Sequence, residues 1–208
     1  MLAADLPGRG WNELFDGKTL AGWTPQNGQP QQWIVDGGLL ANGPQGKVNN
    51  IVSEKLFGDV ELFAEFQIPA GSNSGIYLQG LYEVQIFDSF GKAKLTTQDG
   101  GAIYHRWIGE KPVGGSIPLS NAAMRPGEWQ TYQIAFQAPR FDRAGKKTVA
   151  AKFDKVIYNG QLVQENTACE GPTRSAMNVP EASMGPLMVQ GDHGPVKFRR
   201  LCWRPLKT

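Results

Sequence analysis

The chain has 208 residues, of which 40% are hydrophobic and 19% are charged, and its 21 Lys and Arg residues nearly balance 19 Asp and Glu residues. This length and composition predict one globular domain over residues 1–208, because a chain of this size can bury a substantial core. A net charge of only +2 without a polybasic run argues against nucleic acid as a partner, and no apolar stretch reaches the roughly 20 residues of a membrane-spanning helix.

The first residues lack the charged start and the apolar run of a secretory signal, which leaves two interpretations open. Either the protein is cytoplasmic, or Met1 stands where a signal has been removed. The two cysteines, Cys169 and Cys202, form either two buried thiols or one disulfide. They are scattered relative to His105 and His193 without ligand spacing, so we expect no Cys/His zinc site.

Short alternating runs separated by Gly and Pro recur along the chain. In D-V-E-L-F-A-E-F-Q-I (59–68), apolar and polar residues alternate with the period of a half-buried strand. Further strands are expected at 32–35, 51–53, 74–79, 129–136, 148–153, 187–190 and 196–203. The pair Asn159-Gly160 predicts a tight hairpin turn. Together these signals predict an all-β sandwich or jelly roll of two mainly antiparallel sheets.

Three long Gly- and Pro-containing intervals, 91–101, 108–127 and 168–184, are expected to be surface loops, where functional residues often lie. The first two flank Tyr104, His105, Arg106 and Trp107. Aromatic rings beside Arg and amide side chains suit sugars, whose C–H faces pack on rings while their hydroxyls bond to polar groups. For Trp107, core packing and ligand stacking remain equally open.

The run L-Y-E-V-Q-I-F-D (81–88) places Glu83 and Gln85 on one face of a strand and apolar side chains on the other. A regular continuation would turn Asp88 toward the apolar side, where an unpaired carboxylate is costly. We therefore predict a β-bulge at Ile86 or Phe87, which would return Asp88 to the face of Glu83 and Gln85.

The preceding run, G-S-N-S-G-I-Y-L-Q-G (71–80), also alternates. If the two runs pair as an antiparallel hairpin through Gly80 and Leu81, Tyr77 and Gln79 join the polar surface of the next strand. That surface is either a ligand-binding groove or an ordinary solvated sheet face.

The chain resembles the 3-keto-disaccharide hydrolase domain family (DUF1080) over about residues 10–206, through the ordered motifs W-N-E-L-F-D-G-K-T-L-A-G-W, W-I-V-D-G-G-L-L, N-S-G-I-Y-L-Q-G, Y-E-V-Q-I-F-D, G-A-I-Y, P-G-E-W-Q-T-Y-Q-I and G-D-H-G-P-V-K-F-R-R. The resemblance implies a concanavalin A-like lectin/glucanase sandwich and a periplasmic or secreted location. One departure is the closing motif, expected as Q-D-H-G, because Gly191 here separates Gln190 from Asp192 and His193.

The same fold class includes glucanases with an E-x-D-x-x-E strand motif, and Glu83, Gln85 and Asp88 stand at those offsets. Retaining hydrolysis needs two carboxyl groups about 5 to 5.5 Å apart, which the shorter Asp88 makes harder to reach. We therefore rank this chemistry below the one that the resemblance implies.

The implied substrate is a 3-keto-disaccharide or 3-keto-glycoside, whose ketone makes the C2 hydrogen acidic. A base removes that hydrogen, an acid assists departure of the C1 leaving group, and water adds to the product. We expect Glu83 and His193 to form the acid/base pair, with Asp88 orienting a group or holding a hydroxyl. Asn73 and Gln85 would bind hydroxyls, and Tyr104 or Arg106 would face the ketone. The other expected substrate-binding residues are Tyr77, Gln79, His105, Trp107, Gln190 and Asp192.

Two alternatives stay open at this point. His193 precedes Gly194 and Pro195, so it could be a turn histidine that bonds Asp192 for structure alone. The whole domain could be a non-catalytic carbohydrate-binding module, against which the set of Glu83, Asp88 and His193 argues. No cofactor is expected, and metal assistance is left open.

Overall fold

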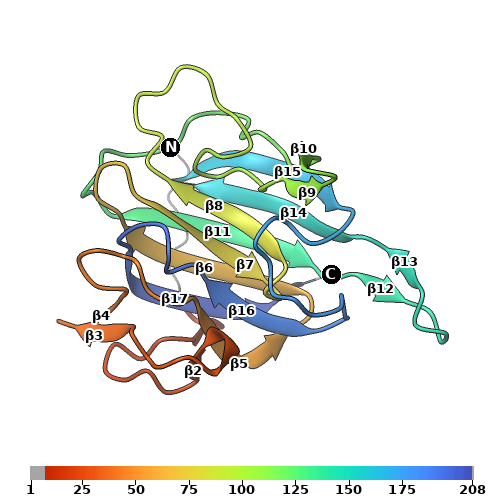
Figure 1. Ribbon diagram of the computed structural model, residues 1–208, viewed down its shortest axis with the longest axis horizontal. Coiled ribbons are helices and arrows are strands. Elements are labelled where there is room, and N and C mark those ends of the chain that lie inside the picture. The colour runs from red at the N-terminus through yellow and green to blue at the C-terminus, as the bar shows by residue number, and fades with distance from the viewer. Residues whose placement is uncertain (1–7, 208) are drawn as a thin grey trace.

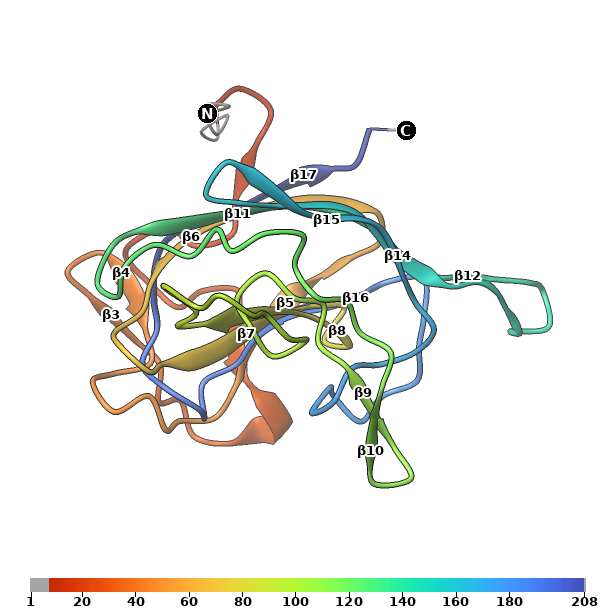
Figure 2. The same cartoon turned by 90° about the horizontal axis from the view of Figure 1, so that it is seen from above.

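The computed structural model describes residues 8–207, which form a β-sandwich of an eight-stranded and a five-stranded sheet (Figure 2). Every strand pair within the two sheets is antiparallel, as the sequence predicted. The one helical segment in this range is a 3-10 turn, η1 (Gln26–Gly28). No helix among the described residues is long and apolar enough to cross a membrane.

Figure 1 labels the strands of both sheets except β1. The larger sheet runs, in spatial order, through β15 (Gln161–Cys169), β14 (Ala151–Tyr158), β11 (Gln130–Gln137), β6 (Val60–Gln67), β17 (Lys197–Pro205), β4 (Leu39–Ala41) and β3 (Ile34–Asp36), with β1 (Asn12–Glu13) paired to β17. The smaller sheet runs through β2 (Trp23–Pro25), β5 (Ile51–Phe57), β16 (Gly185–Val189), β7 (Asn73–Leu78) and β8 (Tyr82–Phe87). Two separate hairpins are β9 (Arg106–Ile108) with β10 (Lys111–Val113), and β12 (Arg140–Phe141) with β13 (Lys147–Val149).

The alternation in β6 explains how the larger sheet meets the core. Leu62, Ala64 and Phe66 belong to the buried cluster between the sheets. Glu61 and Glu65 lie on the other face, where both form ion pairs with arginines of β17. The sequence prediction for this strand is confirmed.

The turn between β14 and β15 is also as predicted. Tyr158 pairs with Gln161, so Asn159 and Gly160 form the whole connection. Their φ angles are +49° and +78°, the left-handed values that a type I′ turn requires and that Asn and Gly tolerate.

The hairpin of β7 and β8 gives the smaller sheet its polar outer face. The cross-strand pairs Tyr77 with Glu83, Gly75 with Gln85 and Asn73 with Phe87 follow one another in regular register. The apolar residues that alternate with them, Ile76, Leu78, Tyr82, Val84 and Ile86, belong to the buried core cluster. Residues 79–81 form the turn, so pairing stops before Gln79, which the sequence prediction had placed in the strand.

The predicted bulge at Ile86 or Phe87 is wrong, since the register is unbroken to the end of β8. Phe87 stays on the polar face, half-buried, and the strand ends there. Asp88 lies beyond the strand, where its carboxylate accepts hydrogen bonds from the backbone N–H groups of Gly71 (2.9 Å) and Phe90 (3.4 Å). The carboxylate therefore avoids the apolar core without any bulge.

Two further segments differ from the sequence prediction. The single run expected at 148–153 is divided between β13 and β14. The loop expected at 108–127 includes most of the β9–β10 hairpin, which projects beyond the smaller sheet in Figure 2. The two cysteines, Cys169 and Cys202, are separate buried thiols, which settles the alternatives that the sequence left open.

Candidate functional site

A polar cavity of about 310 Å³ lies on the outer face of the smaller sheet. Its floor comes from β7 and β8, and its walls come from the segments that follow β8, β15 and β16. The lining residues are Asn73, Tyr77, Glu83, Gln85, Phe87, Lys92, Gln98, Tyr104, Arg174, Ser175, Gln190 and His193.

Glu83 occupies its place because the strand beside it has no side chain at one position. A Cβ atom added to Gly75 would lie 2.1 Å from the Glu83 Oε1 atom. Gly75 stands opposite Gln85, two pairs along from Tyr77 and Glu83 and on the same face of the sheet, so the carboxyl folds into the space above the Gly75 backbone. The glycine thus makes room for a buried acid on the sheet.

Gly75→Ala should therefore destabilise the protein through Glu83. We expect the free energy of unfolding to fall by about 1–3 kcal/mol, the usual cost of overpacking. Urea denaturation of Gly75→Ala, Glu83→Ala and the double variant measures the coupling. The alanine should cost much less in the Glu83→Ala background, and an equal cost in both backgrounds would contradict a direct clash.

The Glu83 carboxyl is only 2% exposed, and its electrostatics follow from that burial. Burial raises the pKa of Glu83 from 4.5 to about 8, the adjacent Tyr77 hydroxyl opposes part of the rise, and the charge of Asp192 adds to it. At neutral pH the group is therefore mainly a protonated carboxylic acid, which can donate a proton.

Two phenols stand near this acid. Burial raises the pKa of Tyr104, and the charge of Glu83 adds to the rise, so the hydroxyl remains a proton-bearing donor. Burial likewise raises the pKa of Tyr77 well above its ordinary value. The Tyr77 hydroxyl also donates a hydrogen bond to the backbone oxygen of Arg174, at 3.4 Å.

Among residues 8–207, three amide oxygens of the cavity lining are buried without a hydrogen-bond partner: Asn73 Oδ1, Gln85 Oε1 and Gln190 Oε1. The Gln85 amide nitrogen donates to the Gln98 backbone oxygen at 3.3 Å, which fixes the orientation of the Gln85 oxygen. Buried acceptors are nearly always satisfied in native proteins, so these oxygens call for a ligand that presents donors. A sugar with several hydroxyl groups has that chemistry.

His193 lines the same cavity and contacts an acid. Its Nδ1 atom lies 2.5 Å from Asp192 Oδ1. If Nδ1–H donates to this carboxylate, the Nε2 lone pair is left free to accept a proton. Gln190 also reaches the cavity despite the added Gly191, because its backbone bonds to Gly75 and to the Ser74 hydroxyl.

The turn that carries His193 is fastened by the buried side chain of Asn42. The Asn42 amide donates to the backbone oxygens of Gly191 (3.1 Å) and Gly194 (2.9 Å) and accepts from the Val196 N–H (2.8 Å). Asn42, which directly follows β4, thus links the larger sheet to the position of a candidate catalytic group.

Asn42→Ala should lower the free energy of unfolding by about 2–4 kcal/mol, because three hydrogen bonds to buried backbone groups would be lost together. Urea denaturation can measure the loss. Asn178→Ala is a matched control, since that asparagine is exposed. Equal stability of the two variants would show that Asn42 does not hold the turn.

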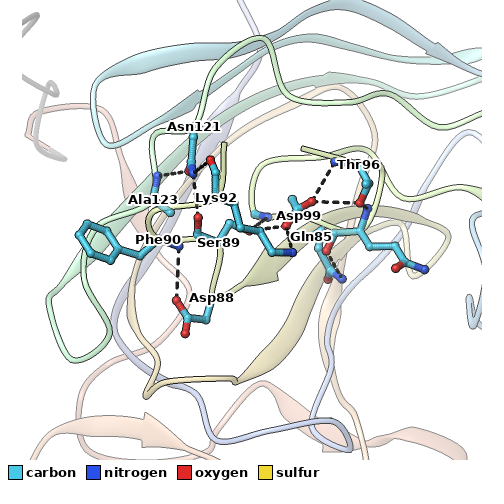
Figure 3. A network of polar contacts seen from close by, with 11 residues as sticks. Gln85, Asp88, Ser89, Phe90, Lys92, Thr96, Asp99, Asn121 and Ala123 are labelled. Atoms are coloured by element: carbon cyan, nitrogen blue, oxygen red, sulfur yellow. Dashed lines mark hydrogen bonds and ion pairs between the residues drawn. The ribbon is translucent and has the colours of Figure 1, made fainter. Parts of the chain in front are cut away.

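The loop after β8 is held together by the buried carboxylate of Asp99 (Figure 3). This group accepts hydrogen bonds from Ser89 Oγ (2.8 Å), Lys92 Nζ (2.6 Å), Thr96 N (2.8 Å) and Thr96 Oγ1 (2.9 Å). Burial would raise the pKa of Asp99, but these bonds outweigh it and hold the pKa below its ordinary value. Lys92 and Gln98 are thereby presented to the cavity as parts of an ordered loop.

The segment after β15 is tied to the β7–β8 hairpin. Thr173 Oγ1 accepts from the Glu83 N–H (3.2 Å) and donates to the Leu81 backbone oxygen (3.1 Å). The next two residues, Arg174 and Ser175, line the cavity, and Ser175 has a φ of +62°. A serine in this left-handed region costs conformational energy, as residues at functional sites often do.

Six residues expected at the site from the sequence are not in the lining, and four of them have structural partners. Asp88 caps the chain after β8, as described above. Gln79 lies in the hairpin turn with a φ of +57° and donates its amide to the Phe57 backbone oxygen (3.1 Å). His105 is 3% exposed, with Nδ1 3.0 Å from Thr97 Oγ1, and Arg106 packs over Gly171.

The two remaining residues stand just outside the lining. Asp192 contacts His193, which is itself in the cavity. Trp107 is 45% exposed, and the Arg174 guanidinium lies over its ring at 4.1 Å. Core packing of Trp107, one of the two alternatives that the sequence left open, is therefore excluded.

Sequence reasoning missed five lining residues: Phe87, Lys92, Gln98, Arg174 and Ser175. Four of them lie in loops without periodicity, where only the general rule that loops carry function pointed to them. Among residues 8–207, no group of three or more His, Cys, Asp or Glu side chains is placed to hold a metal ion.

Comparisons with known proteins identify the family and the fold. A family model described as the 3-keto-alpha-glucoside-1,2-lyase-like domain matches residues 10–204. A proposed glycosyl hydrolase of Parabacteroides distasonis is 32% identical in sequence, with a TM-score of 0.76 over 95% of this chain and 84% of that one. A comparison with curated proteins gave no match.

Two more distant structures share the fold. A second proposed glycosyl hydrolase of Parabacteroides distasonis has 18% identity and a TM-score of 0.68, covering 95% of this chain and 94% of that one. The carbohydrate-binding module CBM66 of Bacillus subtilis has 11% identity and a TM-score of 0.53, covering 88% and 95%. At these identities the likeness extends to the sandwich alone.

Proposed function

Because the chain belongs to the 3-keto-alpha-glucoside-1,2-lyase-like domain family, we propose that its cavity cleaves glycosides that carry a ketone at C3. The observation that carries the proposal is the buried acid Glu83, which lines one cavity together with His193 and three unpartnered amide oxygens. The amides supply acceptors for sugar hydroxyls. The acid and the imidazole supply the proton transfers.

In the proposed reaction, His193 acts as the general base and Glu83 as the general acid. The free Nε2 lone pair of His193 takes the C2 hydrogen, which the C3 ketone acidifies, and the electron pair moves onto the ketone oxygen as an enolate. The enolate then expels the group at C1, and the protonated Glu83 carboxyl gives its proton to the departing oxygen. The sugar product is an enone with a C1–C2 double bond.

The enolate oxygen needs donors that are in place before the reaction. The Tyr104 hydroxyl, the Asn73 amide and the Lys92 ammonium all belong to groups in the lining and can donate. Addition of water at C1 of the enone would complete a net hydrolysis. In this scheme elimination and hydration take place in the same cavity. Release of the enone means that the reaction stops at elimination, and release of the hydrated sugar means that both steps occur.

The proposal is tested by incubating the protein with a 3-keto-disaccharide and, separately, with the unoxidised parent sugar. We expect monosaccharide release from the keto sugar only. Chromatography then identifies the sugar product as the enone or as its hydrate. Binding of both sugars without any release would instead identify a carbohydrate-binding module.

A further inference from the structure

Arg174, at the rim of the cavity, is a cationic side chain without an acidic partner in the described part of the chain. Lys92 is paired with Asp99 at 2.6 Å, and His193 contacts Asp192 at 2.5 Å. Within residues 8–207, none of the ion pairs includes Arg174, although its side chain lines the cavity. An exposed guanidinium in a ligand cavity without a protein partner is available to a ligand.

Arg174 is also held in place before any ligand arrives. Its guanidinium lies 4.1 Å from the ring centre of Trp107, which belongs to the projecting β9–β10 hairpin (Figure 2). Its backbone N–H donates to the His105 oxygen (2.9 Å), and its backbone oxygen accepts from the Tyr77 hydroxyl. The aromatic ring covers one face of the guanidinium, so little side-chain freedom remains to be lost on binding.

Tyr77 relates this cation to the proposed proton donor. Tyr77 is the cross-strand partner of Glu83, and its hydroxyl donates a hydrogen bond to the backbone oxygen of Arg174. Arg174 therefore lies one side chain away from the acid that would protonate the departing oxygen. A substrate whose keto ring contacts the unpartnered amide oxygens would direct the group on that departing oxygen toward Arg174.

We propose that Arg174, supported by Trp107, is a subsite for a carboxylate on the leaving group of the keto-glycoside. The inference rests on the proposed function, because it assigns the substrate class of the same cavity. A planar guanidinium can donate two parallel hydrogen bonds to a carboxylate, a geometry that a neutral hydroxyl does not match. Acidic aglycones are thus favoured over neutral ones of the same shape.

The test compares the 3-keto-glucoside of 4-hydroxybenzoate with that of its methyl ester, in the native protein and in Arg174→Gln. The kcat/KM ratio of acid to ester should fall about ten-fold in Arg174→Gln, the size expected for a charge-assisted hydrogen bond. Arg143→Gln removes an exposed arginine of the β12–β13 turn and should keep the native ratio. Arg174→Lys keeps the positive charge but loses the planar group that can donate two parallel hydrogen bonds. Its acid-to-ester ratio should therefore lie between those of the native protein and Arg174→Gln.

A second measurement makes the inference independent of turnover. Calorimetric titration with the two unoxidised glucosides should show tighter binding of the acid by the native protein and equal binding by Arg174→Gln. If neither keto-glucoside is cleaved, the proposed function fails, and calorimetry alone then decides the subsite. An acid-to-ester ratio that is the same in the native protein and Arg174→Gln, in kinetics or in binding, would overturn the inference.

Discussion

Replacing Glu83 by Gln should lower kcat on a 3-keto-disaccharide by about 10² to 10⁴, the range for losing one general acid or base. Glutamine has nearly the same shape and keeps hydrogen-bonding capacity, but it has no proton to give to the departing oxygen. Substrate should therefore still bind, and KM should change much less than kcat. Steady-state release of monosaccharide measures both parameters.

The matched control is Glu165→Gln, which removes an exposed acid of β15 and should leave kcat unchanged. If Glu83→Gln retains native turnover, Glu83 is not the proton donor, and the role must pass to His193. If the protein is only a carbohydrate-binding module, neither form has turnover, and the substitution changes sugar affinity modestly.

The same substitution should stabilise the protein at alkaline pH. In the native protein the pKa of Glu83 is raised from 4.5 to about 8 by burial. Between these values the unfolded chain has released a proton that the folded chain still holds, so the stability of the native protein falls as the pH rises. Glutamine does not titrate. The stability advantage of Glu83→Gln should thus grow by about 3–5 kcal/mol between pH 4.5 and 8.5.

Urea denaturation of the native protein and Glu83→Gln at pH 4.5, 6.5 and 8.5 checks this expectation. Other titrating groups are shared by the two proteins, so their contributions cancel in the difference. Glu165→Gln, which replaces an exposed acid, again serves as the control. A constant difference for Glu83→Gln would mean that its carboxyl titrates alike in the folded and unfolded chains.

The sequence predicted those parts of the fold that depend on neighbouring residues. The alternation in β6 is a local pattern, and the turn at Asn159 and Gly160 needs only two residues with left-handed backbone angles. The predicted bulge at the end of β8 is wrong for a related reason. The prediction assumed that the strand continues to Asp88. Where a strand ends depends on partners such as the Gly71 N–H, which comes from a different part of the chain.

The same distinction, between local patterns and contacts distant in sequence, applies to the residues of the candidate site. Glu83 and Gln85 could be placed on one face because β8 alternates, and Tyr77 followed from pairing with β7. Arg174 could not be placed at the site from the sequence, because its position depends on hydrogen bonds between a long loop and a distant hairpin turn. Trp107 was selected for its residue type alone, and its contact with a cation became visible only in three dimensions.

The space above Gly75 restricts the order in which this surface can evolve. An ancestor with a larger residue at position 75 would have lost about 1–3 kcal/mol of stability on acquiring the buried acid at 83, because a single Cβ would lie 2.1 Å from its oxygen. The order in which the glycine comes first, or the two positions change together, is therefore favoured. Conversely, a descendant that loses the acid is free to fill position 75. Among related chains, glycine at 75 is therefore expected wherever the acid is kept, and a filled position 75 is expected where the acid is absent.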